Sequence, residues 1–192
     1  MNLSKLALAA ALAAVSGAMA FAPTANAATV TSTGGTITIS GKVIDATCSF
    51  GASGADQTVS LANVSTSNLT ALGQYSGVSK AFTIDLKDCP TNSKVGVQFY
   101  SSNADTTTGN GTLSNTGSAG GVDVQIVDSS STAVSIASTA PTDDTGVSDQ
   151  TDMSTNSGTA SLAYTAYYYV TDVSAVTGGS VSSTTQYVLN YQ

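Results

Sequence analysis

Residues 162–170 read Leu-Ala-Tyr-Thr-Ala-Tyr-Tyr-Tyr-Val, and this stretch decides the fold class of the chain. Large side chains recur at every second position, which is the periodicity of a β-strand with one buried face. That face carries Leu162, Tyr164, Ala166, Tyr168 and Val170. Tyrosine and valine also favour extended backbone. The stretch therefore predicts a strand that packs against a hydrophobic core.

The same alternation occurs elsewhere in the chain. Further strands are predicted at residues 36–43, 57–61, 80–86, 94–100, 122–127 and 184–192, with a short one at 133–136. Polar, turn-rich segments separate them, and the longest predicted loops are residues 101–121, 141–158 and 171–182. Residues 63–77 are mixed in character and compatible with a short helical turn. This arrangement predicts a single all-β domain, a β-sandwich of immunoglobulin-like topology.

The composition excludes several classes of function. The 192 residues include 5 Lys, 12 Asp and no Arg, Glu, His or Trp, and the net charge is −7. A nucleic-acid-binding protein needs a basic surface, which five lysines in an acidic chain cannot form. Without histidine, imidazole is unavailable for catalysis or metal binding. The hydrophobic fraction of 41% favours a folded chain over a disordered one.

The first 27 residues have the organisation of a secretory signal peptide. Lys5 precedes the apolar run 6–22, and Ala25-Asn26-Ala27 fits the small-residue cleavage rule. Cleavage is expected after Ala27, with Ala20 and Ala22 as alternative positions, and a membrane helix is the competing interpretation. The mature chain would then comprise residues 28–192 and contain no transmembrane segment.

Cys48 and Cys89 are the only cysteines in the chain. An oxidising compartment favours a disulfide between them, which would close a loop of about forty residues. Two buried free thiols are the alternative.

The two ends of the chain pose a question about a sheet edge. The sequence stops at Gln192, inside the last predicted strand, whose inward face carries Tyr187, Leu189 and Tyr191. An uncovered edge beside this strand would pair readily with another chain. Either the N-terminal strand folds back to cover it, or a strand from a different molecule does so. Periodicity leaves both possibilities open.

Several motifs carry a resemblance to a known family. They are GGTITISGKVI at 34–44 before Cys48, DQTVSL at 56–61, FTIDLKDC at 82–89, GVDVQIVD at 121–128, Gly178-Gly179, and the terminal Tyr191-Gln192. In this order they resemble the chaperone–usher pilins of Gram-negative bacteria, and within them the major shaft subunits of type 1 fimbriae. The resemblance covers essentially the whole predicted mature chain.

The resemblance implies an incomplete immunoglobulin-like sandwich that lacks its last strand and is completed by a donor strand from another chain. A periplasmic chaperone would first lend a strand, and an outer-membrane usher would then exchange it for the N-terminal extension of the neighbouring subunit. The product would be a homopolymeric fimbria, exported through the periplasm to the cell surface, that supports adhesion. No enzymatic activity and no cofactor or metal are implied.

The family's functional residues correspond to particular positions of this chain. Residues 28–40 match the N-terminal extension and 41–192 the pilin domain, with Ile37, Ile39 and Gly41 on the inserting face of the donor strand. Tyr187, Leu189 and Tyr191 match the acceptor strand that binds both chaperone and donor. Cys48 and Cys89 match the family disulfide.

Other interpretations remain at this stage. The chain could be a minor adaptor pilin near the fimbrial tip, or a self-complemented, secreted immunoglobulin-like binding module. Paired aspartates can hydrolyse glycosides or bind Ca²⁺, and the candidates are Asp143, Asp144, Asp149 and Asp152. They lie in a polar loop with no apolar pocket sequence nearby, so a solvated acidic loop is the favoured interpretation. The cluster Tyr167-Tyr168-Tyr169 predicts strand packing, with sugar stacking as the alternative.

Overall fold

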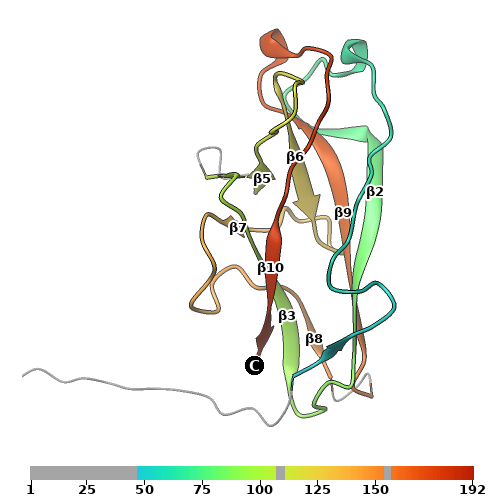
Figure 1. Ribbon diagram of the computed structural model, residues 1–192, viewed down its shortest axis with the longest axis vertical. Coiled ribbons are helices and arrows are strands. Elements are labelled where there is room, and N and C mark those ends of the chain that lie inside the picture. Colours follow the sequence, from blue (N-terminus) through green and yellow to red (C-terminus); the bar gives the residue numbers. More distant parts are fainter. Residues whose placement is uncertain (1–46, 107–110, 154–156) are drawn as a thin grey trace, which may run out of the picture. The chain divides into compact units, whose positions relative to one another are not determined.

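The computed structural model describes residues 47–106, 111–153 and 157–192 of the chain. Regular structure in these ranges is almost entirely β-strand, with two single-turn 3₁₀ helices (Figure 1). The elements are β1 (Ser49–Phe50), η1 (Thr66–Asn68), β2 (Gly73–Lys87), β3 (Lys94–Tyr100), β4 (Ala104–Asp105), β5 (Thr112–Leu113), β6 (Val122–Val127), β7 (Ile136–Ala137), β8 (Ser148–Asp152), β9 (Ala160–Val170), η2 (Val173–Ala175) and β10 (Gln186–Tyr191). The predicted signal peptide and the predicted strand at 36–43 lie outside the described residues.

The first sheet is built around the long antiparallel pair β2 and β9. Its strand order is β1-β2-β9-β6-β5-β4, and all of these pairs are antiparallel. Pairing of β2 with β9 runs from Gly73 opposite Val170 to Leu86 opposite Ala160, with one register shift between Tyr75 and Ser79. The alternating 162–170 stretch thus occupies the centre of the sheet, as its periodicity predicts.

The second sheet is smaller and has β3 at its centre. Its order is β10-β3-β7, and β8 also pairs with β3. The strand β10 is antiparallel to β3, whereas β7 is parallel to it. Among the described residues β10 pairs with β3 alone, so the last strand of the chain forms an edge of this sheet.

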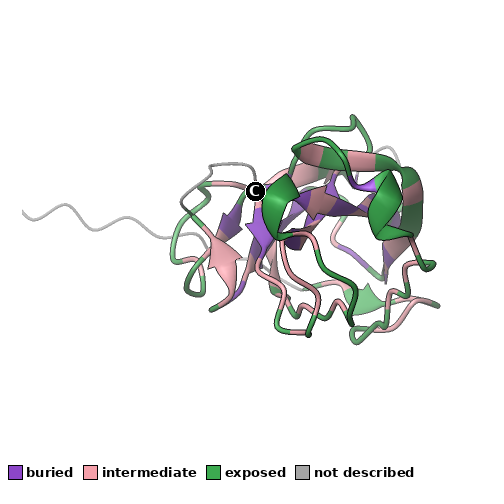
Figure 2. Cartoon of the chain, turned by 90° about the horizontal axis from the view of Figure 1, so that it is seen from above, coloured by how far each residue is buried: buried purple, intermediate pink, exposed green. Residues whose placement is uncertain are grey.

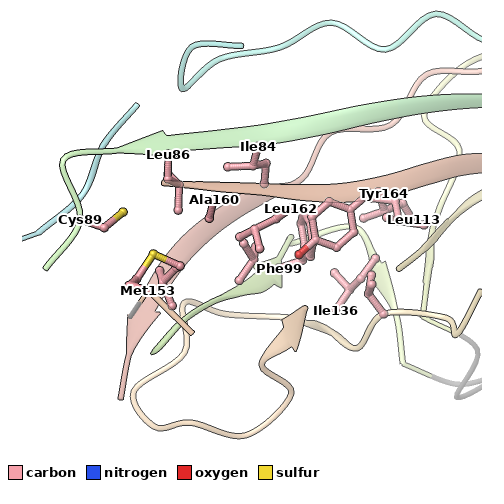
Figure 3. Packing of buried hydrophobic residues seen from close by; sticks show 14 residues of the cluster. Ile84, Leu86, Cys89, Phe99, Leu113, Ile136, Met153, Ala160, Leu162 and Tyr164 are labelled. Atoms are coloured by element: carbon pink, nitrogen blue, oxygen red, sulfur yellow. The ribbon is translucent and has the colours of Figure 1, made fainter. Parts of the chain in front are cut away.

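The hydrophobic core lies between the two sheets (Figure 2). Side chains of β2 and β9 point toward Phe99 of β3 and Ile136 of β7 (Figure 3). Tyr164 is 1% exposed and lies between two phenylalanines, with ring centroids 5.6 Å from Phe82 and 5.0 Å from Phe99. Strand alternation therefore places one buried row from each sheet in a common core.

The predicted disulfide between Cys48 and Cys89 is present, with their Cα atoms 4.2 Å apart. Cys89 follows β2, and its backbone N–H donates to the Gly158 carbonyl at 2.9 Å. The disulfide therefore connects the first described residues of the chain to the turn between β2 and β3.

Several predictions of secondary structure are wrong. The predicted loop 101–121 contains the two-residue strands β4 and β5, which pair with each other, and β5 also pairs with β6. Of the predicted strand 133–136, Ile136 alone belongs to a strand, β7. Residues 57–61 form no strand, because within the described part of the chain they make no backbone ladder with a neighbouring strand. The predicted polar loop 141–158 contains β8, whose sequence Ser-Asp-Gln-Thr-Asp has no apolar alternation. It becomes a strand through pairing with β3, since tertiary context overrides weak strand propensity.

Candidate functional site

An open groove runs along the side of the sandwich between two segments that are distant in sequence. One wall is formed by residues 55–61, which we call the first lip, and the other by residues 181–187, which we call the second lip. The space between them has a volume of about 920 Å³. In Figure 1 the first lip is the blue-green segment beside β2, and the second is the red segment that leads into β10.

The floor of the groove is the hydrophobic core itself. Side chains of both sheets line it, namely Phe82, Ile84, Phe99, Leu113, Val124, Ile126, Ala166 and Tyr168. A completed sandwich would cover these side chains with a further strand. The core is therefore open along this one side.

The first lip is held against β2 by a few hydrogen bonds rather than by a strand ladder. The Gln57 side-chain amide donates to the Thr83 carbonyl at 2.8 Å. Just before the lip, the Gly51 N–H donates to the Asp85 carbonyl at 2.7 Å. The short strand β1 adds a two-residue pairing with β2. The lip is thus fixed mainly at its beginning.

The second lip presents strand-like backbone to the groove. Gln192 and Lys94 exchange both backbone hydrogen bonds, at 2.9 and 2.8 Å, so they form a closely paired position of the antiparallel ladder. Such positions alternate with positions whose backbone groups point away from the partner strand. Leu189 and Tyr187 lie an odd number of residues from Gln192 in an unbroken register. Their backbone groups therefore point away from β3, toward the open side of the sheet.

The residues of the second lip that precede β10 in the chain are held by hydrogen bonds that involve side chains. The Ser101 hydroxyl donates to the Thr184 carbonyl at 2.7 Å, and the Thr185 hydroxyl donates to the Tyr100 carbonyl at 3.1 Å. The backbone N–H and the hydroxyl of Thr116 both donate to the Ser182 carbonyl. The second lip is therefore anchored to neighbouring segments at residues 182, 184 and 185.

The structure places the predicted acceptor residues in two positions. Tyr187 lines the groove. Leu189 and Tyr191 are half-buried and pack against the main core cluster below the groove. The predicted donor residues Ile37, Ile39 and Gly41 lie outside the described residues.

The first lip and the floor were not among the predicted site residues. The alternation of the motif DQTVSL at 56–61 predicts a strand of the sheet and not the wall of a groove. Its alternation is the only signal in the sequence. A segment that awaits a partner strand has the same periodicity as a segment that already has one.

The groove is suited to a neutral, partly apolar occupant. Among the described residues that line it, Asp56 is the one charged side chain. Burial raises the pKa of the Tyr187 hydroxyl, and the Asp56 carboxylate raises it further. Burial also raises the pKa of Tyr191, against the lowering effect of the hydrogen bond from the Cys48 N–H. Both hydroxyls are therefore protonated at neutral pH.

The tyrosine cluster of β9 is divided between the two faces of the first sheet. Tyr168 is buried, and its hydroxyl donates to the Ala62 carbonyl at 3.1 Å, just beyond the first lip. Tyr167 and Tyr169 are half-buried on the opposite face. Burial raises the pKa of Tyr168 and, more strongly, that of Tyr164. Strand packing thus accounts for Tyr168.

The aspartates of the acidic loop make separate local hydrogen bonds. The Asp144 carboxylate accepts from the Asn190 side chain at 2.6 Å, and that of Asp149 from the Ser129 hydroxyl at 2.6 Å. The Thr145 backbone N–H donates to Asp143 and lowers the pKa of that carboxyl. Over residues 47–106, 111–153 and 157–192, no group of three or more His, Cys, Asp or Glu side chains is arranged to hold a metal ion. Within the same described ranges, no helix is long and apolar enough to cross a membrane.

Solved structures show which fold this is. The P pilus rod subunit PapA superimposes with a TM-score of 0.58 at 22% identity, over 77% of this chain and 100% of that one. A subunit from a chaperone–usher pilus structure that concerns rod uncoiling also gives a TM-score of 0.58, at 23% identity, over 85% of this chain and 99% of that one. The fold is therefore the immunoglobulin-like β-sandwich of pilus subunits, as the strand pattern and the resemblance predicted.

Sequence relatives give the family. The chain is 35% identical over 162 residues to the F17 fimbrial protein of Escherichia coli, covering 80% of this chain and 84% of the relative. It is 32% identical over 157 residues to the type-1 fimbrial protein A chain of E. coli K12, covering 79% and 80% respectively. The family model described as "Fimbrial protein" matches residues 37–192. The chain therefore belongs to the fimbrial protein family.

Proposed function

We propose that this protein is a structural subunit of a bacterial surface fimbria, and that its groove accepts an extended strand from the neighbouring subunit. The observation that carries the proposal is the open core between residues 55–61 and 181–187. Relatives named as fimbrial subunits support the structural role.

The first lip of the groove has the length of a typical strand. It is seven residues long, and an extended segment of that length spans about 23 Å. A strand laid beside β10 would find the outward backbone groups of Tyr187 and Leu189 as hydrogen-bonding partners. Every second side chain of the incoming strand would then face the apolar floor.

Residues 37–43 of another copy are the occupant we propose. They alternate between apolar and polar residues, with Ile37 and Ile39 on the face that would meet the floor, and Lys42 is their one charge. At Gly41 the absence of a side chain would allow close approach of the backbone. A neutral, alternating segment matches a groove with one charged lining residue.

Geometry favours a strand from a second copy over the chain's own segment. Cys48 lies at the C-terminal end of β10, where its N–H donates to the Tyr191 hydroxyl. The chain's own 37–43 segment enters the groove easily only when parallel to β10. An antiparallel arrangement would place residue 43 at the far end of the groove. The five residue steps from 43 to 48 reach about 18 Å at most, which is less than the length of about 23 Å that the chain would have to return. A separate copy has no such restriction and can form the commoner antiparallel pair.

An open groove also implies a carrier before assembly. Exposed apolar surface beside an unpaired strand edge promotes aggregation. We therefore propose that a periplasmic chaperone covers the groove during export and that an outer-membrane usher exchanges it for the next subunit. The finer assignment as major shaft subunit rather than adaptor belongs to the same proposal.

The test is a strand-exchange assay with the subunit held by its chaperone. A peptide of residues 28–43 is added, and native mass spectrometry follows release of the chaperone. We expect a one-to-one complex of subunit and peptide. A control peptide with Ile37→Asp and Ile39→Asp should bind at least a hundredfold more weakly, since each isoleucine that loses burial costs about 1.5–3 kcal/mol. Equal binding of the two peptides, or none of the native one, would contradict the proposal.

A further inference from the structure

We infer that Tyr187 and Tyr191 are positioning residues that brace the empty groove before the donor arrives, Tyr187 by joining β10 to the first lip and Tyr191 by joining β10 to Cys48. The inference rests on the proposed function and extends it to the state of the subunit without a donor. It concerns two hydroxyl groups of β10, of which that of Tyr187 reaches Ala55 in the first lip and that of Tyr191 reaches Cys48, outside the groove lining.

The first brace is Tyr187. Its hydroxyl donates to the Ala55 carbonyl at 2.8 Å, at the start of the first lip. Its ring meets the Phe50 ring edge-on at 6.1 Å and lies 6.2 Å from the Phe99 ring. Aromatic contacts on both sides therefore fix the direction in which the hydroxyl points.

The second brace is Tyr191. Its hydroxyl accepts the backbone N–H of Cys48 at 2.9 Å. Cys48 is itself bonded to Cys89, which is 6% exposed and belongs to the main core cluster. This contact therefore connects the C-terminal end of β10 to a point that the disulfide already anchors.

The general spacing of β-strands explains why a tyrosine at position 187 can reach the first lip. Two strands that flank a missing strand are separated by two strand spacings, about 9.5 Å. Tyrosine is a long uncharged side chain, and with a hydrogen bond of 2.8 Å beyond its hydroxyl it bridges a gap of this order. Phenylalanine at the same position would place its ring equally but would make no bond to the far wall.

A brace of this kind opposes collapse of the open core. The apolar floor favours movement of the lips toward each other, because this removes apolar surface from water. A collapsed groove would have to reopen before a strand could enter. The two hydroxyl bonds therefore prolong the state that is competent for assembly, without contributing to the grip on a donor that is already bound.

The first test measures the lifetime of the competent state. The mature chain is refolded by dilution, an excess of peptide 28–43 is added after increasing delays, and the yield of complex is measured by native mass spectrometry. Tyr187→Phe should shorten the competent half-life about two- to tenfold, the range expected for one net hydrogen bond. The rate at which peptide leaves the finished complex should be unchanged. Tyr167→Phe, on the outer face of β9, is the matched control and should change neither quantity.

Two results of this experiment would overturn the brace. Faster peptide release with an unchanged half-life would mean that the Tyr187 hydroxyl grips the donor instead. No change in either quantity would mean that the hydroxyl does nothing for the groove.

The second test does not depend on donor binding. Amide hydrogen exchange is measured on the subunit without a donor, and Tyr191→Phe should speed exchange of the Cys48 amide about two- to tenfold. The Gly51 amide, which donates to the Asp85 carbonyl, is the internal control. Unchanged exchange at Cys48 would refute the second brace. If the exchange result holds while the wild-type chain takes up no peptide, the donor assignment fails and the brace stands.

Discussion

Removal of the disulfide should destabilise the subunit by an amount that follows from its position in the chain. Cys48 and Cys89 are separated by 41 positions. For a closed loop of this size the chain-entropy model gives about 4 kcal/mol at 25 °C. We therefore expect Cys48→Ala with Cys89→Ala to lower the free energy of unfolding by about that amount. Alanine is preferable to serine because Cys89 is buried, and a buried hydroxyl would add a separate cost.

The loss should be concentrated at the groove. The disulfide holds the beginning of the segment that leads into the first lip, which otherwise relies on β1 and on isolated bonds such as Gln57 to Thr83. In the double variant, exchange at the Gly51 amide should therefore increase more than exchange at amides in the centre of β9. Affinity for peptide 28–43 should fall in parallel.

The assay is urea unfolding of the subunit saturated with peptide 28–43, with and without the disulfide. For an m-value near 2 kcal/mol/M, a loss of about 4 kcal/mol lowers the midpoint by about 2 M. Reduction of the wild-type protein with dithiothreitol should give the same shift, which separates the cross-link from the alanine side chains. A midpoint shift below about 0.3 M by both routes would refute the reasoning that the bond stabilises this fold.

Three further predictions concern the donor, the core and pH. Gly41→Leu in the mature chain should abolish fibre assembly while chaperone binding persists, because the leucine side chain would occupy the space that close approach of the donor backbone requires. Ser40→Ala is the control. Normal fibres from Gly41→Leu in electron micrographs would contradict the assignment of Gly41 to the donor strand. Leu162→Ala should lower the free energy of unfolding by about 2–5 kcal/mol, since Leu162 is 2% exposed in the core, whereas Ala163→Ser on the outer face should change it by less than about 0.5 kcal/mol. The folded-state pKa values of Tyr187 and Tyr191 lie above the ordinary value near 10. The free energy of unfolding that their protonated hydroxyls contribute is therefore fully present below about pH 10. It is lost as the pH rises through the folded-state pKa. The urea midpoint of the peptide complex should therefore be constant from pH 7 to 9 and fall above pH 10. In Tyr187→Phe the fall should be less steep. An identical fall in that variant would exclude the Tyr187 hydroxyl as a contributor to the pH dependence of stability.

Strands with an alternating apolar pattern were predictable from the sequence. Residues 94–100 and 122–127 form β3 and β6 with the predicted bounds, because their alternation matches the face that the core requires. The second strand is longer than its apolar pattern, since β2 begins at Gly73 and its first half pairs with β9 while largely exposed. Backbone pairing with β9 therefore extends β2 beyond the residues whose apolar alternation predicts a strand.

The groove was only half predictable. Tyr187 belongs to a strand whose apolar face is visible in the sequence, and the structure places it in the lining. Residues 55–61 also alternate, but whether a partner strand lies beside them depends on the arrangement of both sheets. No local sequence pattern shows whether a partner strand lies beside these residues. The hydrogen bonds from the β10 tyrosine hydroxyls to Ala55 and Cys48 depend on the same tertiary arrangement.

The central claim is that the groove of one copy is filled by the N-terminal segment of another. Two variants of the chain are expressed together with the assembly machinery. One carries Ile39→Cys in the donor segment, and the other carries Ser183→Cys in the second lip. The fibres are then oxidised and analysed on denaturing gels. The account predicts a cross-linked product of two chains that contains one copy of each variant and disappears on reduction. A single chain that carries both substitutions and cross-links only within itself would contradict the account and identify a self-complemented module instead.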